Sequence, residues 1–251
     1  MLFRLYVRVG QEFVCSPFFS FCFCFSKLPC YPLWSFSKNT AIGQASVKIT
    51  GKGLYKGTKT VNFNIRPATV TKLKVSSTGE KSVKLSWKKV TGADSYAIYR
   101  YDNTSKKWQR IKTVKAVSFT DSGLARAKGY SYKVKAVKKS GGKEYISASY
   151  SKAIEAVTKP AKASCTAKSA GSGNIEVSWK AVGGASGYEI YSSSNGSDYV
   201  KSAKVGGSKK SAIVSGFEPY SLRMVKVRAY KTVNGKTSYG AFSQAVMVIV
   251  R

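Results

Sequence analysis

The chain has 251 residues, with 43 Lys and Arg against 11 Asp and Glu and no His, so its formal net charge is +32. The lack of His excludes Ser-His-Asp and Cys-His catalysis and removes the commonest metal ligand. Basic residues occur along the whole length, which favours a surface that attracts polyanions over one basic tail. The alternative is that this charge only keeps the protein soluble.

Residues 1–40 differ from the rest. The first 36 hold four of the five Cys and eight of the twelve Phe. Arg4 and Arg8 before an apolar run resemble an export signal, but no small-residue cleavage site follows, and Pro17 breaks the run before it could span a membrane. The Cys spacings are unlike the paired Cys-x2-Cys of zinc sites. We expect a disordered segment that is either a degenerate export or anchoring segment or non-native sequence.

Residues 41–66 predict a β-hairpin. Residues 45–50 and 59–65 alternate apolar and polar side chains, which is typical of half-buried strands. Three glycines in the intervening GKGLYKGT indicate the loop. Because a lone hairpin is marginally stable in water, the pair is interpreted as the end of a truncated domain.

Residues 67–158 predict an antiparallel two-sheet sandwich. Strand candidates recur between turn signals, without any sustained helical period. They cover 73–77, 82–89, 95–101, 107–114, 117–121, 130–139 and 145–157.

Residues 159–251 repeat this pattern. WKKVTGADSYAIYR at 87–100 returns as WKAVGGASGYEIYS at 179–192. Lys159-Pro160 is a very short joint, so we expect limited hinge motion between the repeats. The strand candidates are 174–182, 186–193, 198–205, 211–217, 223–233 and 237–250.

The shared motif W-x-x-V-x-G-A-x-x-Y-x-I-Y resembles the fibronectin type III modules of Gram-positive bacterial surface and secreted proteins. Trp87 and Trp179 stand where that family keeps a core Trp, and Leu124 with Tyr130 resembles its tyrosine corner. Residues 41–66 are similar to the closing hairpin of bacterial Ig-like repeats. The resemblance implies an all-β chain: two tandem fibronectin type III-like sandwiches, preceded by a partial hairpin and an irregular N-terminal segment.

Apolar positions in phase with the strand pattern predict the two cores, because alternate residues of a strand face the same side. In the first repeat they are Trp87, Tyr96, Ile98, Leu124, Tyr130 and Val134. In the second they are Trp179, Tyr188, Ile190 and Val227.

No motif predicts catalysis, a cofactor or a metal site. The carboxylates are scattered and lie mostly at turns, and no Gly-rich phosphate loop opens a helix. Cys165 has no Cys near it in the sequence, which favours a small buried or edge residue over a nucleophile. We therefore expect no catalytic, cofactor-binding or metal-binding residues.

One candidate binding site is aromatic and basic. Trp108 lies outside the core phase, and Tyr101 on the neighbouring strand could extend an aromatic platform flanked by Lys107 and Arg110. Such a platform suits sugar stacking, whereas nothing beyond charge supports specific nucleic-acid binding. The alternative is that Trp108 only covers the sheet edge.

Together these features predict a non-catalytic cell-surface or secreted protein, built from spacer or adhesion modules that adjoin other domains of a longer parent. The alternative is an accessory module of a larger protein, enzymatic or not, that binds polysaccharide or anionic cell-wall polymers. We expect an extracellular or surface location, without a clear export signal in this chain, and no transmembrane span.

The second repeat should be less stable than the first. Counting back from Ala229, the equivalent of Ala136, places Arg223 where Tyr130 stands, so the corner hydrogen bond should be missing. Tyr130→Phe should destabilise the first repeat by about 1 kcal/mol, the usual net contribution of a hydrogen bond. Urea melts of the separate repeats measure both effects, and equal midpoints for the two wild-type repeats would contradict the ranking.

Overall fold

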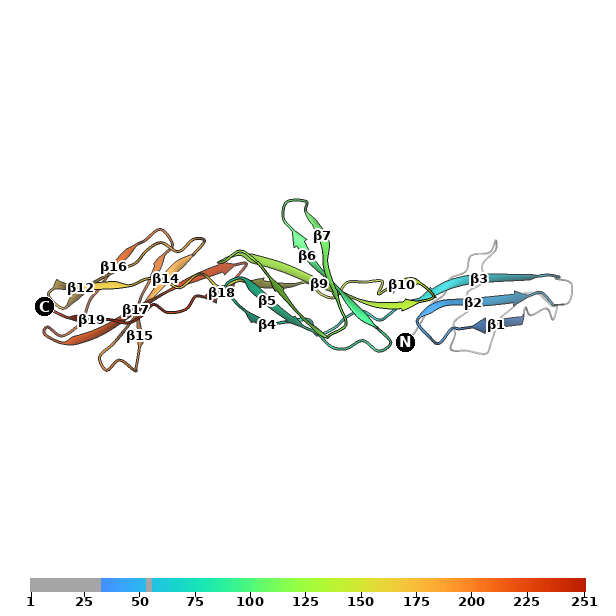
Figure 1. Cartoon of the computed structure of the whole chain (residues 1–251), viewed down its shortest axis with the longest axis horizontal. Helices are drawn as coiled ribbons and strands as arrows, with labels where there is room; N and C mark the ends of the chain where they lie inside the picture. The colour runs from blue at the N-terminus through green and yellow to red at the C-terminus, as the bar shows by residue number, and fades with distance from the viewer. Residues whose placement is uncertain (1–32, 53–55) are drawn as a thin grey trace, which may run out of the picture. The chain divides into compact units, whose positions relative to one another are not determined.

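The computed structural model describes residues 33–52 and 56–251, and their regular secondary structure is entirely β-strand (Figure 1). The interpretations of the cysteine-rich start as an export, anchoring or non-native segment fall mostly on residues 1–32, outside the described part. Among the described residues, no helix is long and apolar enough to cross a membrane. The three-stranded sheet nearest the N-terminus and the remainder of the chain are separate compact units.

In the part of the first unit that the structure describes, the sheet has three strands rather than the two of a hairpin. Its order is β1 (Leu33–Ser37), β2 (Gly43–Thr50) and β3 (Thr58–Ile65). β1 lies in the segment that was expected to be irregular, and it pairs antiparallel with β2 from Leu33–Thr50 to Ser37–Ser46. Its five residues are all exposed and show no alternation, so only pairing with β2 makes them a strand.

The first repeat is the predicted sandwich. One sheet has the order β4-β5-β8, and the other has the order β10-β9-β6-β7, with β11 pairing on β9. The strands are β4 (Lys74–Thr78), β5 (Ser82–Ser86), β6 (Ser95–Asp102), β7 (Lys107–Val114), β8 (Ser118–Ser122), β9 (Gly129–Ser140), β10 (Lys143–Ile146) and β11 (Ile154–Val157).

The second repeat has the same topology. Its sheets have the orders β12-β13-β16 and β15-β14-β17-β18, with β19 pairing on β17. The polar β12, TAKSAG, was not predicted and is a strand through its pairing with β13. The strands are β12 (Thr166–Gly171), β13 (Asn174–Ser178), β14 (Gly187–Ser193), β15 (Val200–Gly206), β16 (Ser211–Val214), β17 (Leu222–Val233), β18 (Lys236–Tyr239) and β19 (Val246–Ile249).

The repeated motif ties a loop to the core of each sandwich. Trp87 packs against Tyr96 with ring centroids 5.4 Å apart, and the Tyr96 hydroxyl accepts a hydrogen bond of 2.8 Å from the Val90 amide. In the second repeat, the Tyr188 hydroxyl accepts one of 2.7 Å from the Val182 amide. The Tyr therefore fills the core with its ring and fixes the turn after the Trp with its hydroxyl.

The core positions named from the sequence lie inside the two sandwiches. All are buried except Tyr130, which packs against the first core while partly exposed. The buried ones are Trp87, Tyr96, Ile98, Leu124, Val134, Trp179, Tyr188, Ile190 and Val227.

The tyrosine corner is present in the first repeat, where the Tyr130 hydroxyl accepts a hydrogen bond of 2.9 Å from the Ala125 amide. Arg223 takes the equivalent place, since Tyr130 pairs with Ala156 and Arg223 with Val248. The Arg223 guanidinium lies 5.1 Å from the Phe217 ring centre, and its buried Nε has no hydrogen-bond partner. This geometry is consistent with a weaker corner in repeat two.

The last strand of each repeat is broken, which corrects the single strands expected over 145–157 and 237–250. Between β10 and β11, Ser151 donates its amide to the Val134 carbonyl and accepts the Val134 amide on its hydroxyl at 3.0 Å. Ser243 makes the same pair of bonds with Val227. The side chain thus replaces a main-chain acceptor of the sheet, and an alternation pattern does not reveal that exchange.

Ser151→Ala should therefore lower the free energy of unfolding of repeat one by about 1–3 kcal/mol, because it leaves the buried Val134 amide without its acceptor. Ser149→Ala, an exposed change in the same segment, should stay within about 0.5 kcal/mol. Chemical denaturation of the two variants makes the comparison. Equal effects would show that the hydroxyl does not satisfy the amide.

Candidate functional site

The predicted aromatic pair lies on the outer face of the β10-β9-β6-β7 sheet. Tyr101 on β6 stands opposite Trp108 on β7, with ring centroids 5.3 Å apart, and both side chains are half-buried. Lys107 is exposed and stands opposite Asp102. A hydrogen bond from the Ser105 hydroxyl, with others from backbone amides, lowers the pKa of the Asp102 carboxyl, so this turn is held by a charged carboxylate.

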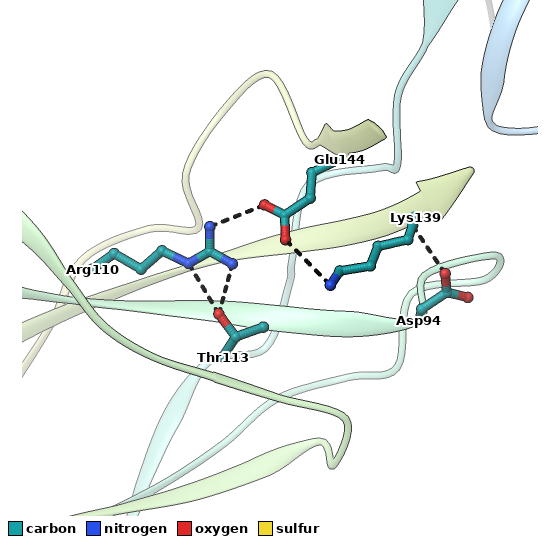
Figure 2. Close-up of polar contacts among 5 residues, drawn as sticks. All are labelled: Asp94, Arg110, Thr113, Lys139 and Glu144. Carbon is teal, nitrogen blue, oxygen red and sulfur yellow. Dashed lines mark hydrogen bonds and ion pairs between the residues drawn. The ribbon is translucent and has the colours of Figure 1, made fainter. Parts of the chain in front are cut away.

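Arg110, the fourth predicted residue, forms its hydrogen bonds with other side chains of the protein (Figure 2). Its Nη1 bonds Glu144 at 3.1 Å, and its Nε donates to the Thr113 hydroxyl at 3.0 Å. The hydrogen bond from Arg110 lowers the pKa of Glu144, although burial opposes the shift. Glu144 also lies 4.0 Å from Lys139, whose amide donates to Asp94. Arg110 therefore ties β7 to β10 instead of joining the aromatic pair.

Two lysines on β9, which were not predicted from the sequence, lie against the aromatic side chains. Lys133 Nζ lies 4.4 Å from the Trp108 ring centre and 5.3 Å from that of Tyr150, while Lys135 Nζ lies 4.2 Å from Tyr150. Tyr99 packs edge-on against Tyr150 at 4.9 Å. The lysine–aromatic face is defined here as Tyr99, Tyr101, Trp108, Lys133, Lys135 and Tyr150.

A sequence signal for these lysines exists. Tyr132 and Val134 alternate with Lys133 and Lys135 along β9, and because the first pair is buried in the core, the second must point outward. Tyr150 gave no such signal, because it lies in the break between β10 and β11.

The second repeat has an equivalent face. Lys226, which pairs with Tyr191 as Lys133 pairs with Tyr99, lies 3.4 Å from the Tyr199 ring centre and 4.5 Å from that of Phe242. Arg228 corresponds to Lys135 and lies 4.1 Å from Tyr239. In both repeats, basic side chains therefore lie next to aromatic rings on the outer face of the larger sheet, although the residue types differ.

A buried carboxylate distinguishes the second face. Glu189 is only 2% exposed, and its Oε2 accepts hydrogen bonds from Arg228 Nη2 at 2.7 Å and Nε at 3.0 Å. Lys201 lies 3.5 Å from its other oxygen. Burial acts to raise the Glu189 pKa, but the bonds and charges of Arg228 and Lys201 outweigh it and hold that pKa below its ordinary value. The first repeat has Ala97 at this position.

The remaining reactive groups have structural surroundings. Burial raises the pKa of the Cys165 thiol, which disfavours the thiolate form. The buried Tyr132 hydroxyl donates to Asp121 at 2.8 Å, and Arg100 bonds the same carboxylate oxygen. Among the described residues, no group of three or more Cys, Asp or Glu side chains is arranged to hold a metal ion.

Known proteins resemble this chain in sequence over part of its length and in fold over most of it. Over 100 residues, 40% of this chain, the sequence is 42% identical to a poly(3-hydroxybutyrate) depolymerase of Ralstonia pickettii, but the match spans only 18% of that protein. Three chicken contactin fibronectin domains, FN1–FN3 of CNTN1, align over 83% of this chain and 77% of theirs, with 16% identity and a TM-score of 0.38. A two-domain fibronectin type III segment of chicken tenascin aligns over 74% and 99%, with 20% identity and a TM-score of 0.42. No family model matches the chain.

Glu189→Gln should destabilise the second repeat at neutral pH by about 2 kcal/mol, less than for a fully buried pair because the Arg228 side chain keeps 22% exposure. The stabilisation from a lowered pKa is present above the ordinary value of 4.5 and is lost as the pH falls through the folded-state pKa. Urea denaturation over descending pH should show the difference between variant and wild type shrinking.

The matched control is Glu176→Gln, which removes a carboxylate paired with the largely exposed Lys168. It should cost less than about 1 kcal/mol. A Glu189→Gln effect that stays constant over the acid range would rule out the charge as its source.

Proposed function

We propose that the chain is a non-catalytic connector segment of a larger extracellular protein. In this role the two fibronectin type III-like sandwiches form a stiff spacer that holds neighbouring domains apart. The observation that carries the proposal is the construction of the joint between the repeats, where almost no residue is left free to act as a hinge.

The joint residues are bound to the first repeat. Thr158 is fully buried, its amide donates to the Lys128 carbonyl at 3.0 Å, and its hydroxyl donates to the Ala125 carbonyl at 2.7 Å. The Lys159 amide donates to the Gly79 carbonyl at 2.9 Å. Since Ala163 already belongs to the second core, only residues 160–162 connect the two bodies, and Pro160 restricts them further.

A side-chain contact strengthens the joint. Asn234, in the turn between β17 and β18 of the second repeat, donates to the Glu155 carboxylate of the first at 2.9 Å. Lys236 Nζ donates to the Glu155 carbonyl at 3.0 Å. These bonds cross from β11 to the β17–β18 hairpin and oppose bending at residues 160–162.

The far end of repeat two presents large apolar side chains where the joint has smaller ones. Val250 donates its amide to Ser221 as Thr158 does to Lys128, so the two ends are equivalent. At the joint, Ala127 and Val157 are each 5% exposed. In repeat two the equivalent Tyr220 is 86% exposed and Ile249 is 61% exposed. Large apolar side chains at this position suit contact with a further module.

The depolymerase relative suggests what a parent protein could carry. The match spans a small part of that enzyme, which fits a segment of a polymer-degrading protein whose chemistry is performed by another domain. An extracellular or surface location follows from this role, since a polymer too large to enter a cell is degraded outside it.

Residual dipolar couplings of the full chain in solution test the connector. Both sandwiches should fit one alignment tensor, and a control with Gly-Gly-Ser inserted between Lys159 and Pro160 should need two, because the insertion adds free residues to the joint. Two tensors in the wild-type chain would contradict a stiff spacer. Release of soluble product from poly(3-hydroxybutyrate) particles by the purified chain would contradict a non-catalytic segment.

A further inference from the structure

The lysine–aromatic face of repeat one carries positive charge that the repeat's own carboxylates do not neutralise. Most carboxylates of repeat one pair with cations other than Lys133 and Lys135. The pairs are Glu80–Arg126, Asp94–Lys138, Asp121–Arg100, Glu144–Arg110 and Glu144–Lys139. Asp102 is engaged by its own turn and Glu155 by the joint. Within the described residues, Lys133 and Lys135 have no carboxylate within ion-pair distance; Lys135 donates to the Ala148 carbonyl at 3.1 Å.

Repeat two shows how such a face binds a carboxylate. There Glu189 supplies the anion from β14, and Arg228 and Lys201 converge on it. Repeat one has the corresponding cation, Lys135, but Ala97 in place of the glutamate. The first face therefore keeps Lys135 from this arrangement and lacks the central anion, whereas Arg110, which pairs with Tyr99 as Lys201 pairs with Tyr191, is bonded to Glu144.

We propose that the lysine–aromatic face of repeat one binds a linear acidic polysaccharide, whose carboxylate groups bridge Lys133 and Lys135. Ala97 is fully buried, so the anion binds at the level of the ammonium groups rather than against the strand. The rings of Trp108 and Tyr150 position the two ammonium groups, which lie 4.4 Å and 4.2 Å from the ring centres. This binding is separate from the connector role and can fail without affecting it.

The arrangement of the rings favours a polysaccharide over a nucleic acid. Unpaired bases are bound by stacking on free aromatic faces. Here lysine ammonium groups already lie over the rings of Trp108 and Tyr150, and Tyr99 and Tyr101 pack against neighbouring rings. An acidic sugar needs charged donors more than a free ring face, and the two lysines supply these donors.

The field of the protein assists the encounter, because the excess of Lys and Arg over Asp and Glu gives a net charge of +32 for the whole chain. Global charge alone would attract any polyanion to any surface. The test therefore has to separate a local site from the total charge.

The full chain is passed over immobilised polygalacturonate, a linear polymer of carboxylated sugars, at about 0.15 M salt. Fully methyl-esterified polygalacturonate is the neutral reference. Wild type should bind the acid form and not the ester. Lys133→Gln with Lys135→Gln should weaken binding at least tenfold. Thermal melts confirm that this double variant remains folded.

The matched control is Lys84→Gln with Lys88→Gln, which removes two exposed charges at β5 and just after it, on the other sheet. It should change affinity less than twofold. Equal losses in both double variants would overturn the proposal, since net charge alone would then account for binding. Tighter binding of single-stranded DNA than of polygalacturonate, with the same dependence on Lys133 and Lys135, would overturn it in favour of a nucleic-acid site.

Discussion

Each sandwich depends on a tyrosine that is apolar at one end and polar at the other. The rings of Tyr96 and Tyr188 fill the core beside a tryptophan, and their hydroxyls accept the amides of Val90 and Val182. Without these acceptors, the amide of a turn closing over the core would lack a partner, at a free-energy cost comparable to a lost hydrogen bond. The shared motif thus joins the two sheets and sets the turn that leads into the β6 or β14 strand.

Because the inner-facing side chains of this strand are buried in the core, only its outward-facing side chains can differ between the repeats. Both repeats use that freedom to alternate cations with aromatic rings across the sheet, but they balance the charge differently. Repeat two buries Glu189 beneath Arg228, whereas repeat one places Ala97 there and uses Glu144 on Arg110 instead. One repeat therefore has an internally neutralised centre, and the other has two lysines available to an external anion.

The same division holds at the ends of the sandwiches. Backbone bonds between the last strand and the preceding turn are equivalent in both repeats, through Thr158 and Val250. The side chains differ, because small residues at the joint let the second repeat approach, while Tyr220 and Ile249 project from the far end. The backbone bonding at the two ends is thus the same, and only the side chains that stand there differ.

The sequence alone determined the class of fold, the two-repeat organisation and ten core positions, of which all but Tyr130 are buried, because period-two alternation and an internal repeat are local signals. It did not predict β1 or β12, whose residues form strands only through their partners, or the breaks at Ser151 and Ser243, where a hydroxyl replaces a backbone group. For the candidate site it identified Trp108 and Tyr101 but not Lys133 and Lys135 on β9 or Tyr150 in the break between β10 and β11. It also could not show that Arg110 forms an ion pair with Glu144. Alternation indicates which way a side chain points; which side chains it meets is decided by strand pairing across the sheet, and only the tertiary structure specifies that.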